Sequence, residues 1–244
     1  MDHPDELRLL VHGASGRMGQ ALLRLGRDVP GCRIVAGVSG GRPGQRVIDG
    51  IPQFAASELA GAPAFDVAVD FSLPGAFDRI LALCIERDAA LVSGTTGLDD
   101  AQFAAIDAAA TRIPCAWAAN FSLGVAVLSR LVEQAAAALP DWDCDIVETH
   151  HARKLDAPSG TALALGEVAA AGGAEPRYAS LRAGDIVGEH LVQFTGAGER
   201  IELVHRATSR DVFARGALHA ARQLHGRPPG RYGLRDLLTA PATA

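Results

Sequence analysis

The chain is almost without lysine, since Lys154 is its only lysine beside 22 arginines in 244 residues. Arginine does not give up its proton near neutral pH, whereas lysine can act as an acid, a base or an amine nucleophile. Cysteine is also scarce, and the four cysteines are too far apart to form a paired metal-binding motif. We expect these four to be reduced, buried thiols: Cys32, Cys84, Cys115 and Cys144.

Other absences exclude whole classes of partner. The chain has no basic tract and a formal net charge of −5, so we do not expect it to bind nucleic acid. No apolar stretch approaches the roughly 20 residues that a membrane-spanning helix needs. Residues 1–6 are acidic and polar, which is unlike a signal peptide. We therefore predict a cytoplasmic protein that binds no membrane.

The first 120 residues alternate short apolar runs with helical patterns. This alternation predicts an α/β fold in which helices cover both faces of a parallel sheet. Strands are expected at residues 7–11, 32–38, 66–71, 91–93 and 114–118, and helices at 18–27, 76–87 and 99–111.

The pattern changes after Asn120, where a long apolar helix begins. The segments that follow indicate a strand meander rather than further strand–helix–strand units, and hence a second, α+β domain. The predicted helices are 123–139, 161–171 and 213–224, and the predicted strands are 144–149, 190–195 and 200–204.

A glycine-rich turn, residues 13–19, follows the first predicted strand and opens a helix. Gly13 permits a tight turn, Gly16 allows close approach of the backbone, and the helix start offers N–H groups to a pyrophosphate. Arg17 is placed to meet a phosphate. Glycines alone also fit a plain turn, but this position in an α/β chain favours a dinucleotide site.

The second predicted strand ends without an acidic residue. An acid at this point normally binds the ribose hydroxyls of NAD and would repel a 2′-phosphate. Here the strand ends in Ser39, with Arg42 close behind. We predict that NADPH is used at least as well as NADH, the alternative being a loop at 39–44 that makes no contribution.

Small polar residues follow three more of the predicted strands. These segments are 70–72, 93–97 and 118–122. Each alone is typical of a turn. Together they favour a nicotinamide site, because the carboxyl ends of parallel strands lie at one edge of a sheet.

The lysine lies in the segment 148–162, between two histidines and a helix start. Ser159 is a suitable N-cap, and the N–H groups of Gly160 and Thr161 would face a ligand. His150 and Lys154 differ in acidity, about 6.5 against 10.4 when unperturbed, so together they suit proton transfer next to an anion pocket. Zinc is a weaker interpretation because the pair of histidines lacks a third ligand, and a capped surface turn is the other alternative.

These segments together resemble the 4-hydroxy-tetrahydrodipicolinate reductase family, also called dihydrodipicolinate reductases. The resemblance covers nearly the whole chain, and the string from His150 to Ala162 is its most specific part. The matching segments are 13–19, 70–72, 94–97, 119–124, 148–151, Lys154, 156–162 and 182–190.

The resemblance implies a Rossmann-like dinucleotide-binding domain, residues 1–121 with 213–244, and a substrate-binding and oligomerisation domain, residues 122–212, that builds a homotetramer. It implies hydride transfer from NADPH or NADH to a cyclic imine dicarboxylate, with loss of water, in lysine and diaminopimelate biosynthesis.

His150 and Lys154 are the implied catalytic residues, with no metal. The implied substrate-binding residues are His151, Ser159, Gly160 and Thr161, with help from Thr96. The implied cofactor-binding residues are Gly13, Ala14, Ser15, Gly16, Arg17, Met18, Ser39, Gly94, Thr95, Thr96, Ala118, Ala119, Asn120 and Phe121.

The chain departs from the family pattern at two places. Ser39-Gly40 stands where many members have an acidic residue followed by arginine, which leaves the cofactor preference open. The stretch 172–181 is shorter than usual, which affects the loops and the tetramer interface. Two other functions remain as alternatives: a Schiff-base lyase with Lys154 as nucleophile, and an inactive nucleotide-binding regulator.

Overall fold

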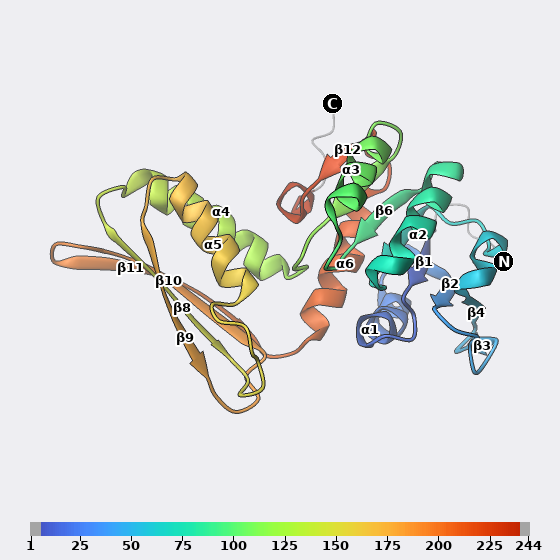
Figure 1. The fold of residues 1–244 in the computed structure, drawn as a ribbon, viewed down its shortest axis with the longest axis horizontal. Coiled ribbons are helices and arrows are strands. Elements are labelled where there is room, and N and C mark those ends of the chain that lie inside the picture. The colour runs from blue at the N-terminus through green and yellow to red at the C-terminus, as the bar shows by residue number, and fades with distance from the viewer. Residues whose placement is uncertain (1–5, 240–244) are drawn as a thin grey trace. The chain divides into compact units, whose positions relative to one another are not determined.

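A computed structural model describes residues 6–239 of the chain, which fall into two compact units. The first unit contains the chain up to Phe121 and the chain from Phe213 onward, and the second unit is Ser122–Val212. Both combine helices with sheet, and the predicted α/β class is confirmed (Figure 1). Within the described residues, no helix is both long and apolar enough to cross a bilayer.

The first unit is built on an eight-stranded sheet in which only β3 runs antiparallel to its neighbour. The strand order is β12-β7-β6-β5-β1-β2-β4-β3. Its strands are β1 (Leu7–His12), β2 (Cys32–Ser39), β3 (Val47–Ile48), β4 (Ile51–Ala55), β5 (Val67–Asp70), β6 (Ala90–Ser93), β7 (Pro114–Trp117) and β12 (Gly230–Tyr232). Its helices are α1 (Arg17–Leu25), α2 (Pro74–Glu86), α3 (Asp100–Ala109) and α6 (Asp211–Leu224), with short 3₁₀ turns at Gly26–Asp28, Ala56–Gly61 and Leu234–Leu237.

Burial explains why the central strands are continuous apolar runs. Every residue of β5 and β6 is buried, as expected for parallel strands covered on both faces. Helices α2 and α3 contribute Phe77, Ile80 and Ile106 to the core on one face. The chain returns after the second unit to add β12 beside β7, which completes the sheet with the end of the described chain.

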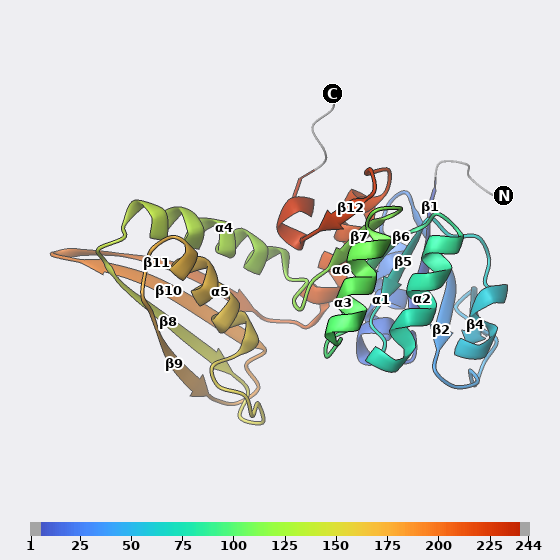
Figure 2. The same cartoon turned by 45° about the horizontal axis from the view of Figure 1, so that its top comes forward.

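The second unit is a four-stranded sheet, in the order β11-β10-β8-β9, with two helices on one face. Figures 1 and 2 both show α4 and α5 on the same side of this sheet. Residues of β8 and β10 alternate between buried and half-buried, which is the pattern of a sheet with one covered face. The elements are α4 (Leu123–Ala138), β8 (Asp143–His150), α5 (Gly160–Ala171), β9 (Pro176–Arg182), β10 (Gly188–Gly196) and β11 (Glu199–Ala207).

The sequence does not predict four of the strands, and its meander prediction is only partly correct. The missed strands are β3, β4, β9 and β12, and β9 fills much of the short stretch 172–181. Strands β10 and β11 do form an antiparallel hairpin. Strands β8 and β9, however, run parallel and are joined through α5, so this part is a strand–helix–strand unit and the meander prediction is wrong there.

The cysteine prediction is confirmed. All four cysteines are free and buried. Burial raises the pKa of the Cys115 thiol to about 12 and that of Cys144 to about 11, so these thiols stay protonated at neutral pH.

Candidate active site

The carboxyl ends of four parallel strands lie in register at one edge of the first unit. His12 of β1 pairs with Asp70 of β5, Asp70 with Ser93 of β6, and Ser93 with Trp117 of β7. The loops that follow these strands therefore leave the sheet at one level. They are the same segments from which the sequence predicts a cofactor site.

The turn after β1 has room only for glycine at two positions. Gly13 has a φ of +84°, and a Cβ there would lie 2.3 Å from the carbonyl oxygen of Phe71. The backbone N–H groups of Gly13 and Ala14 both donate to the carbonyl of Val38, at 2.9 Å. Gly19 is equally confined, because a Cβ there would lie 2.2 Å from the Gly13 oxygen. The turn is thus fixed against the ends of β2 and β5 and the first turns of α1.

The N-terminus of α1 fits the pyrophosphate of a dinucleotide. Its N-cap, Gly16, makes no side-chain capping bond, and the first turn contains no acidic residue. Ser15, Gly16 and Arg17 are exposed, and Met18 is half-buried. Backbone N–H groups and the positive end of the helix dipole attract phosphate at such a site.

Phe71 joins three of the predicted cofactor loops. Its carbonyl faces Gly13, and a Cβ at Gly94 would lie 2.2 Å from a carbon of its ring. The ring also packs edge-on against Phe121, with centroids 5.5 Å apart. The carbonyl of Phe121 in turn lies against Gly216 of α6, where a Cβ has no space. The sequence alone places Phe71 at a strand end and does not reveal this role, because the contacts join segments distant in the chain.

Asp70 is a buried carboxylate that anchors the ends of three strands. Its Oδ1 lies 2.8 Å from Nδ1 of His12, and its Oδ2 accepts hydrogen bonds of 2.8 Å from the hydroxyls of Ser93 and Thr95. Burial opposes ionisation, but hydrogen bonds from His12, Ser72 and Thr95 outweigh it and hold the pKa of Asp70 below its usual value. This network fixes the start of the loop 94–97.

The other predicted cofactor residues are accessible at the same edge. They are exposed or half-buried: Ser39, Gly94, Thr96, Ala118, Ala119 and Asn120.

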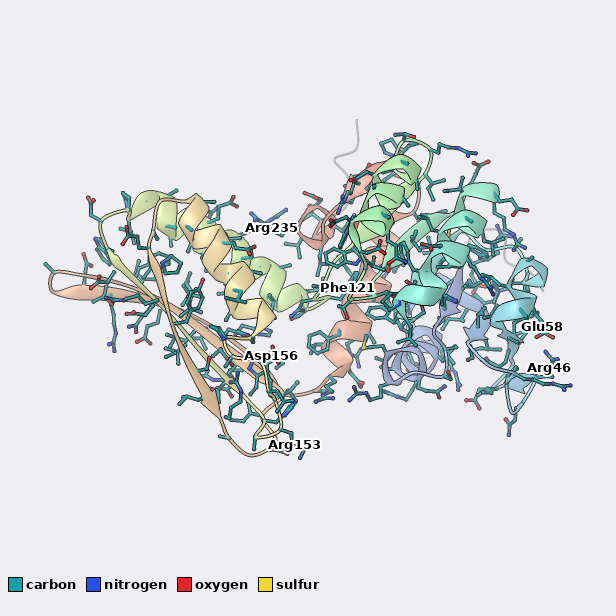
Figure 3. All side chains as sticks on the ribbon, viewed as in Figure 1. Arg46, Glu58, Phe121, Arg153, Asp156 and Arg235 are labelled. Carbon is teal, nitrogen blue, oxygen red and sulfur yellow. The ribbon has the colours of Figure 1, made fainter. Side chains whose placement is uncertain are left out.

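The β4 partner of Ser39 is Ala55, whose N–H donates to the carboxylate of Glu58. Arg46 binds that carboxylate through bonds of 2.6 and 3.0 Å, and this pairing, with the Ala55 bond, lowers the pKa of Glu58 to about 2 (Figure 3).

In the second unit, His150 is buried at the end of β8 and is held by Glu148. Its Nδ1 lies 2.5 Å from Oε2 of Glu148. The two residues are two positions apart in a strand, so both point to the helix-covered face. Gly188 of β10 lies at the opposite edge of the ring, since a Cβ there would be 3.0 Å from Nε2. The ring of His190 packs edge-on against His150 at a centroid distance of 5.2 Å.

Lys154 lies in the loop after β8 and is paired with Asp156. Its Nζ donates to both carboxylate oxygens, at 2.8 and 2.7 Å. This hydrogen-bonded pair lowers the pKa of Asp156. The Asp156 side chain is 62% exposed, so an anionic ligand can compete with it for the ammonium group. Arg153 in the same loop is also exposed (Figure 3).

Ser159 caps α5 as the sequence predicts. Its hydroxyl accepts a hydrogen bond from the N–H of Ala162 at 3.2 Å and lies 3.3 Å from Nε2 of His190. Ser159 is buried in these contacts, whereas Gly160 is exposed and Thr161 half-buried. The first turn of α5 holds no acidic residue, so this helix start suits a carboxylate.

His151 points away from the buried cluster and is half-buried. Desolvation and then the positive charges of Arg153 and Arg210 lower its pKa. Among residues 6–239, its Nδ1 is one of three buried ring nitrogens without a hydrogen-bond partner, together with Nδ1 of His190 and of His205. A ring nitrogen without a partner is free to form a hydrogen bond with a ligand.

The same part of the chain contains no cluster of three or more His, Cys, Asp or Glu side chains placed to hold a metal ion.

The structure thus gathers the predicted cofactor residues in the first unit and the predicted catalytic and substrate residues in the second. It adds Glu148 and Arg182, which the sequence analysis did not single out. Glu148 had a usable signal, because it lies two positions before His150 on a strand. Arg182 begins the family-matching segment 182–190, but its contact with Glu148 spans 34 positions and depends on the pairing of β8 with β9, so no local pattern reveals that contact.

Two family models match the chain: dihydrodipicolinate reductase, N-terminus, over residues 7–121, and dihydrodipicolinate reductase, C-terminus, over residues 124–238. A 4-hydroxy-tetrahydrodipicolinate reductase of Stenotrophomonas maltophilia is 72% identical over 95% of this chain and 98% of its own. One from Xanthomonas campestris pv. campestris is 66% identical over the same shares. Among solved structures, a dipicolinate-bound dihydrodipicolinate reductase from Paenisporosarcina sp. TG-14 matches with a TM-score of 0.82 at 23% identity, over 93% of this chain and 97% of that one.

Proposed function

Since the chain belongs to the dihydrodipicolinate reductase family, we propose that His150 and Lys154 supply the protons for its reaction. The chain is an NAD(P)H-dependent oxidoreductase, a 4-hydroxy-tetrahydrodipicolinate reductase of lysine and diaminopimelate biosynthesis. Its substrate is a cyclic imine dicarboxylate that is reduced with loss of water. This family membership argues against the two alternatives, the lyase and the inactive regulator.

The first unit holds the dinucleotide. Residues 13–18 bind the pyrophosphate at the start of α1, and the loops 94–96 and 118–121 hold the nicotinamide end. Ser39 would help to hold the adenosine ribose, and the absence of an acid at that strand end would admit a 2′-phosphate. The reduced nicotinamide supplies the hydride.

The second unit binds the substrate and supplies protons. Hydride addition to an imine-conjugated ring leaves electron density that must be protonated, and Lys154 and His150 carry the available protons. His151 and the backbone N–H groups of Gly160 and Thr161 hold a carboxylate, supported by Ser159 as the helix cap. One observation carries this assignment: His150 is held by a buried carboxylate in the segment that also contains Lys154 and the acid-free start of α5.

The proposal includes a homotetramer formed through the second unit. The sheet face opposite the helices carries a row of apolar side chains across all four strands, in register: Ala179, Val147, Leu191 and Val204. Val204 is 41% exposed. A second copy that covers this row would bury it. For the proposed homotetramer as a whole, light scattering should give four times 25.3 kDa. Cytoplasmic location is part of the same proposal.

The assignment of the proton donors is tested by substitution. Lys154→Ala and His150→Ala should each lose about 100-fold or more of kcat, since general acid catalysis contributes about 10²–10⁴. Both should still bind NADPH. Arg153→Ala removes a neighbouring exposed cation and is the control, expected to stay within about threefold of the parent. A turnover close to that of the parent in both test variants would refute the assignment.

Lys154→Arg separates charge from proton donation. Arginine keeps the positive charge but donates a proton poorly, so this variant should bind substrate and turn over slowly. An active Lys154→Arg enzyme would leave only the electrostatic part of the role of Lys154.

A further inference from the structure

Glu148 is a fully buried carboxylate that holds His150, and the proposed function gives it no step of its own in the reaction. Its side chain is 0% exposed, and both oxygens are occupied. Oε2 lies 2.5 Å from Nδ1 of His150, and Oε1 accepts the N–H of Ser159 at 3.2 Å. Arg182 donates to Oε2 at 2.9 Å and to Oε1 at 2.7 Å. One carboxylate thus links the end of β8, the start of α5 and the end of β9.

Arg182 keeps this buried carboxylate ionised. Burial opposes the charge of Glu148, but hydrogen bonds from Arg182, Ser180 and His150 overcome that effect and lower the pKa of Glu148 to about 2. A carboxylate that stays charged at neutral pH is a fixed acceptor for an imidazole N–H. The His150 ring must therefore keep its proton on Nδ1 whether it is neutral or charged.

The position of Gly188 defines what the other ring nitrogen can do. A Cβ at Gly188 would lie 3.0 Å from Nε2 of His150, so the absence of a side chain leaves that edge of the ring open. With Nδ1 committed to Glu148, Nε2 is the atom that can exchange a proton with a ligand.

The same guanidinium also reaches the lysine loop. Arg182 donates from Nη2 to the backbone carbonyl of Asp156 at 2.6 Å. Asp156 in turn binds the ammonium of Lys154. The loop that carries Lys154 and the ring of His150 are therefore attached to one ion pair.

We propose that Glu148 is a positioning residue for proton transfer, which orients His150 with Nε2 toward the substrate and stabilises its protonated form. Arg182 holds Glu148 in this role and ties it to the Lys154 loop. The proposal rests on the proposed role of His150. It assigns a function to a side chain that does not itself touch the substrate.

The charge on His150 depends on groups from every element that packs around it. Glu148 is the acidic group that contacts the His150 ring, so removal of its charge is the change that tests the proposal. These groups are Glu148 on β8, Arg182 on β9, His190 on β10, and His151 and Lys154 in the loop.

The test is Glu148→Gln, which keeps the size of the side chain and removes its charge. If the protonated ring is the working form, the basic limb of the kcat–pH profile should move about one unit or more toward lower pH. At neutral pH, kcat should fall about 10- to 100-fold, with a smaller change in the KM for substrate. An unmoved pH limb with an unchanged kcat would overturn the proposal.

Glu58→Gln is the matched control. Glu58 is also bound by an arginine through two bonds and by a backbone N–H, and its pKa is also about 2, but it has no histidine partner. At saturating cofactor its removal should leave the kcat–pH profile unmoved. A shift equal to that of Glu148→Gln would show a general charge effect and overturn the proposal.

A double-mutant cycle separates this proposal from the proposed function. In a His150→Asn background, Glu148→Gln should change kcat by less than about twofold, because Glu148 acts through His150. Equal losses in both backgrounds would overturn the positioning role. If His150→Asn itself keeps full turnover, the proposed function fails instead.

The cycle can also be run with a variant that retains the charge. Glu148→Asp withdraws the carboxylate from Nδ1 by one methylene. It should lower kcat only in the presence of His150 and should leave the pH limb closer to that of the parent. This variant decides the question if Glu148→Gln does not fold, as judged by circular dichroism, and equal losses with and without His150 again contradict the proposal.

Discussion

Replacement of Gly19 by alanine has two opposite effects on the stability of the protein, and the size of each is known. Alanine is favoured over glycine inside a helix by about 1 kcal/mol, so propensity alone predicts a more stable α1. The structure predicts the reverse. A Cβ at Gly19 would lie 2.2 Å from the Gly13 oxygen and 2.6 Å from Cα of Ala14, and neither backbone atom can rotate away. Overpacking of this kind costs about 1–3 kcal/mol, so destabilisation should win.

Gly75→Ala is the matched control. Gly75 also lies in a helix, near the start of α2, and a Cβ there would meet nothing within 4 Å. This variant should be stabilised by up to about 1 kcal/mol. For a chain of this size, about 1 kcal/mol corresponds to a Tm change of 2–4 °C. We therefore expect Gly19→Ala to melt several degrees lower and Gly75→Ala a few degrees higher than the parent.

The same displacement should weaken cofactor binding. Relief of the clash moves the N-terminus of α1 away from the turn at Gly13, where the pyrophosphate binds in the proposed function. We expect the Kd for NADPH, measured by fluorescence titration, to rise about tenfold or more in Gly19→Ala and to stay unchanged in Gly75→Ala, a tenfold change being about 1.4 kcal/mol. A Gly19→Ala protein with a raised Tm and unchanged Kd would refute the packing argument.

Two further predictions concern the cofactor and acid stability. Because β2 ends in Ser39 without an acid, kcat/KM with NADH should not exceed that with NADPH by more than tenfold, and a larger ratio in steady-state assays would refute this. Burial, then the neighbours His150 and His205, lower the pKa of His190 to about 4, against about 6.5 in the unfolded chain. The unfolded chain therefore takes up the proton first, and this contribution to stability, at most about 3 kcal/mol, is lost as pH falls from about 6.5 to 4. His190→Gln should lose less stability than the parent between pH 7 and 5 in urea unfolding, and equal losses would contradict the assignment.

The parts of the site that lie close together in the sequence could be predicted from it. His150, His151 and Lys154 are local neighbours, and the cap at Ser159 follows from residue type alone. The central strands of the first unit are buried on both faces, so their apolar runs are easily recognised.

The rest depends on pairings that residue type does not reveal. Strand β9 begins with a proline and is largely exposed, so it lacks the alternation by which strands are recognised. His12 meets Asp70 across 58 positions, and Glu148 meets Arg182 across 34. Such contacts follow from strand register, which no local pattern specifies.

The pairing of Lys154 with Asp156 has a practical side for anyone who handles this protein. The chain offers one side-chain amine to acylating or reductive-alkylating reagents, on a side chain that is 20% exposed and lies beside its counter-ion. Coupling to an amine-reactive resin or dye, normally scattered over a protein surface, is here limited to the α-amine of the chain and one side chain in the loop after β8. Attachment chemistry aimed at carboxylates leaves that loop intact only if it spares Asp156, whose side chain is 62% exposed.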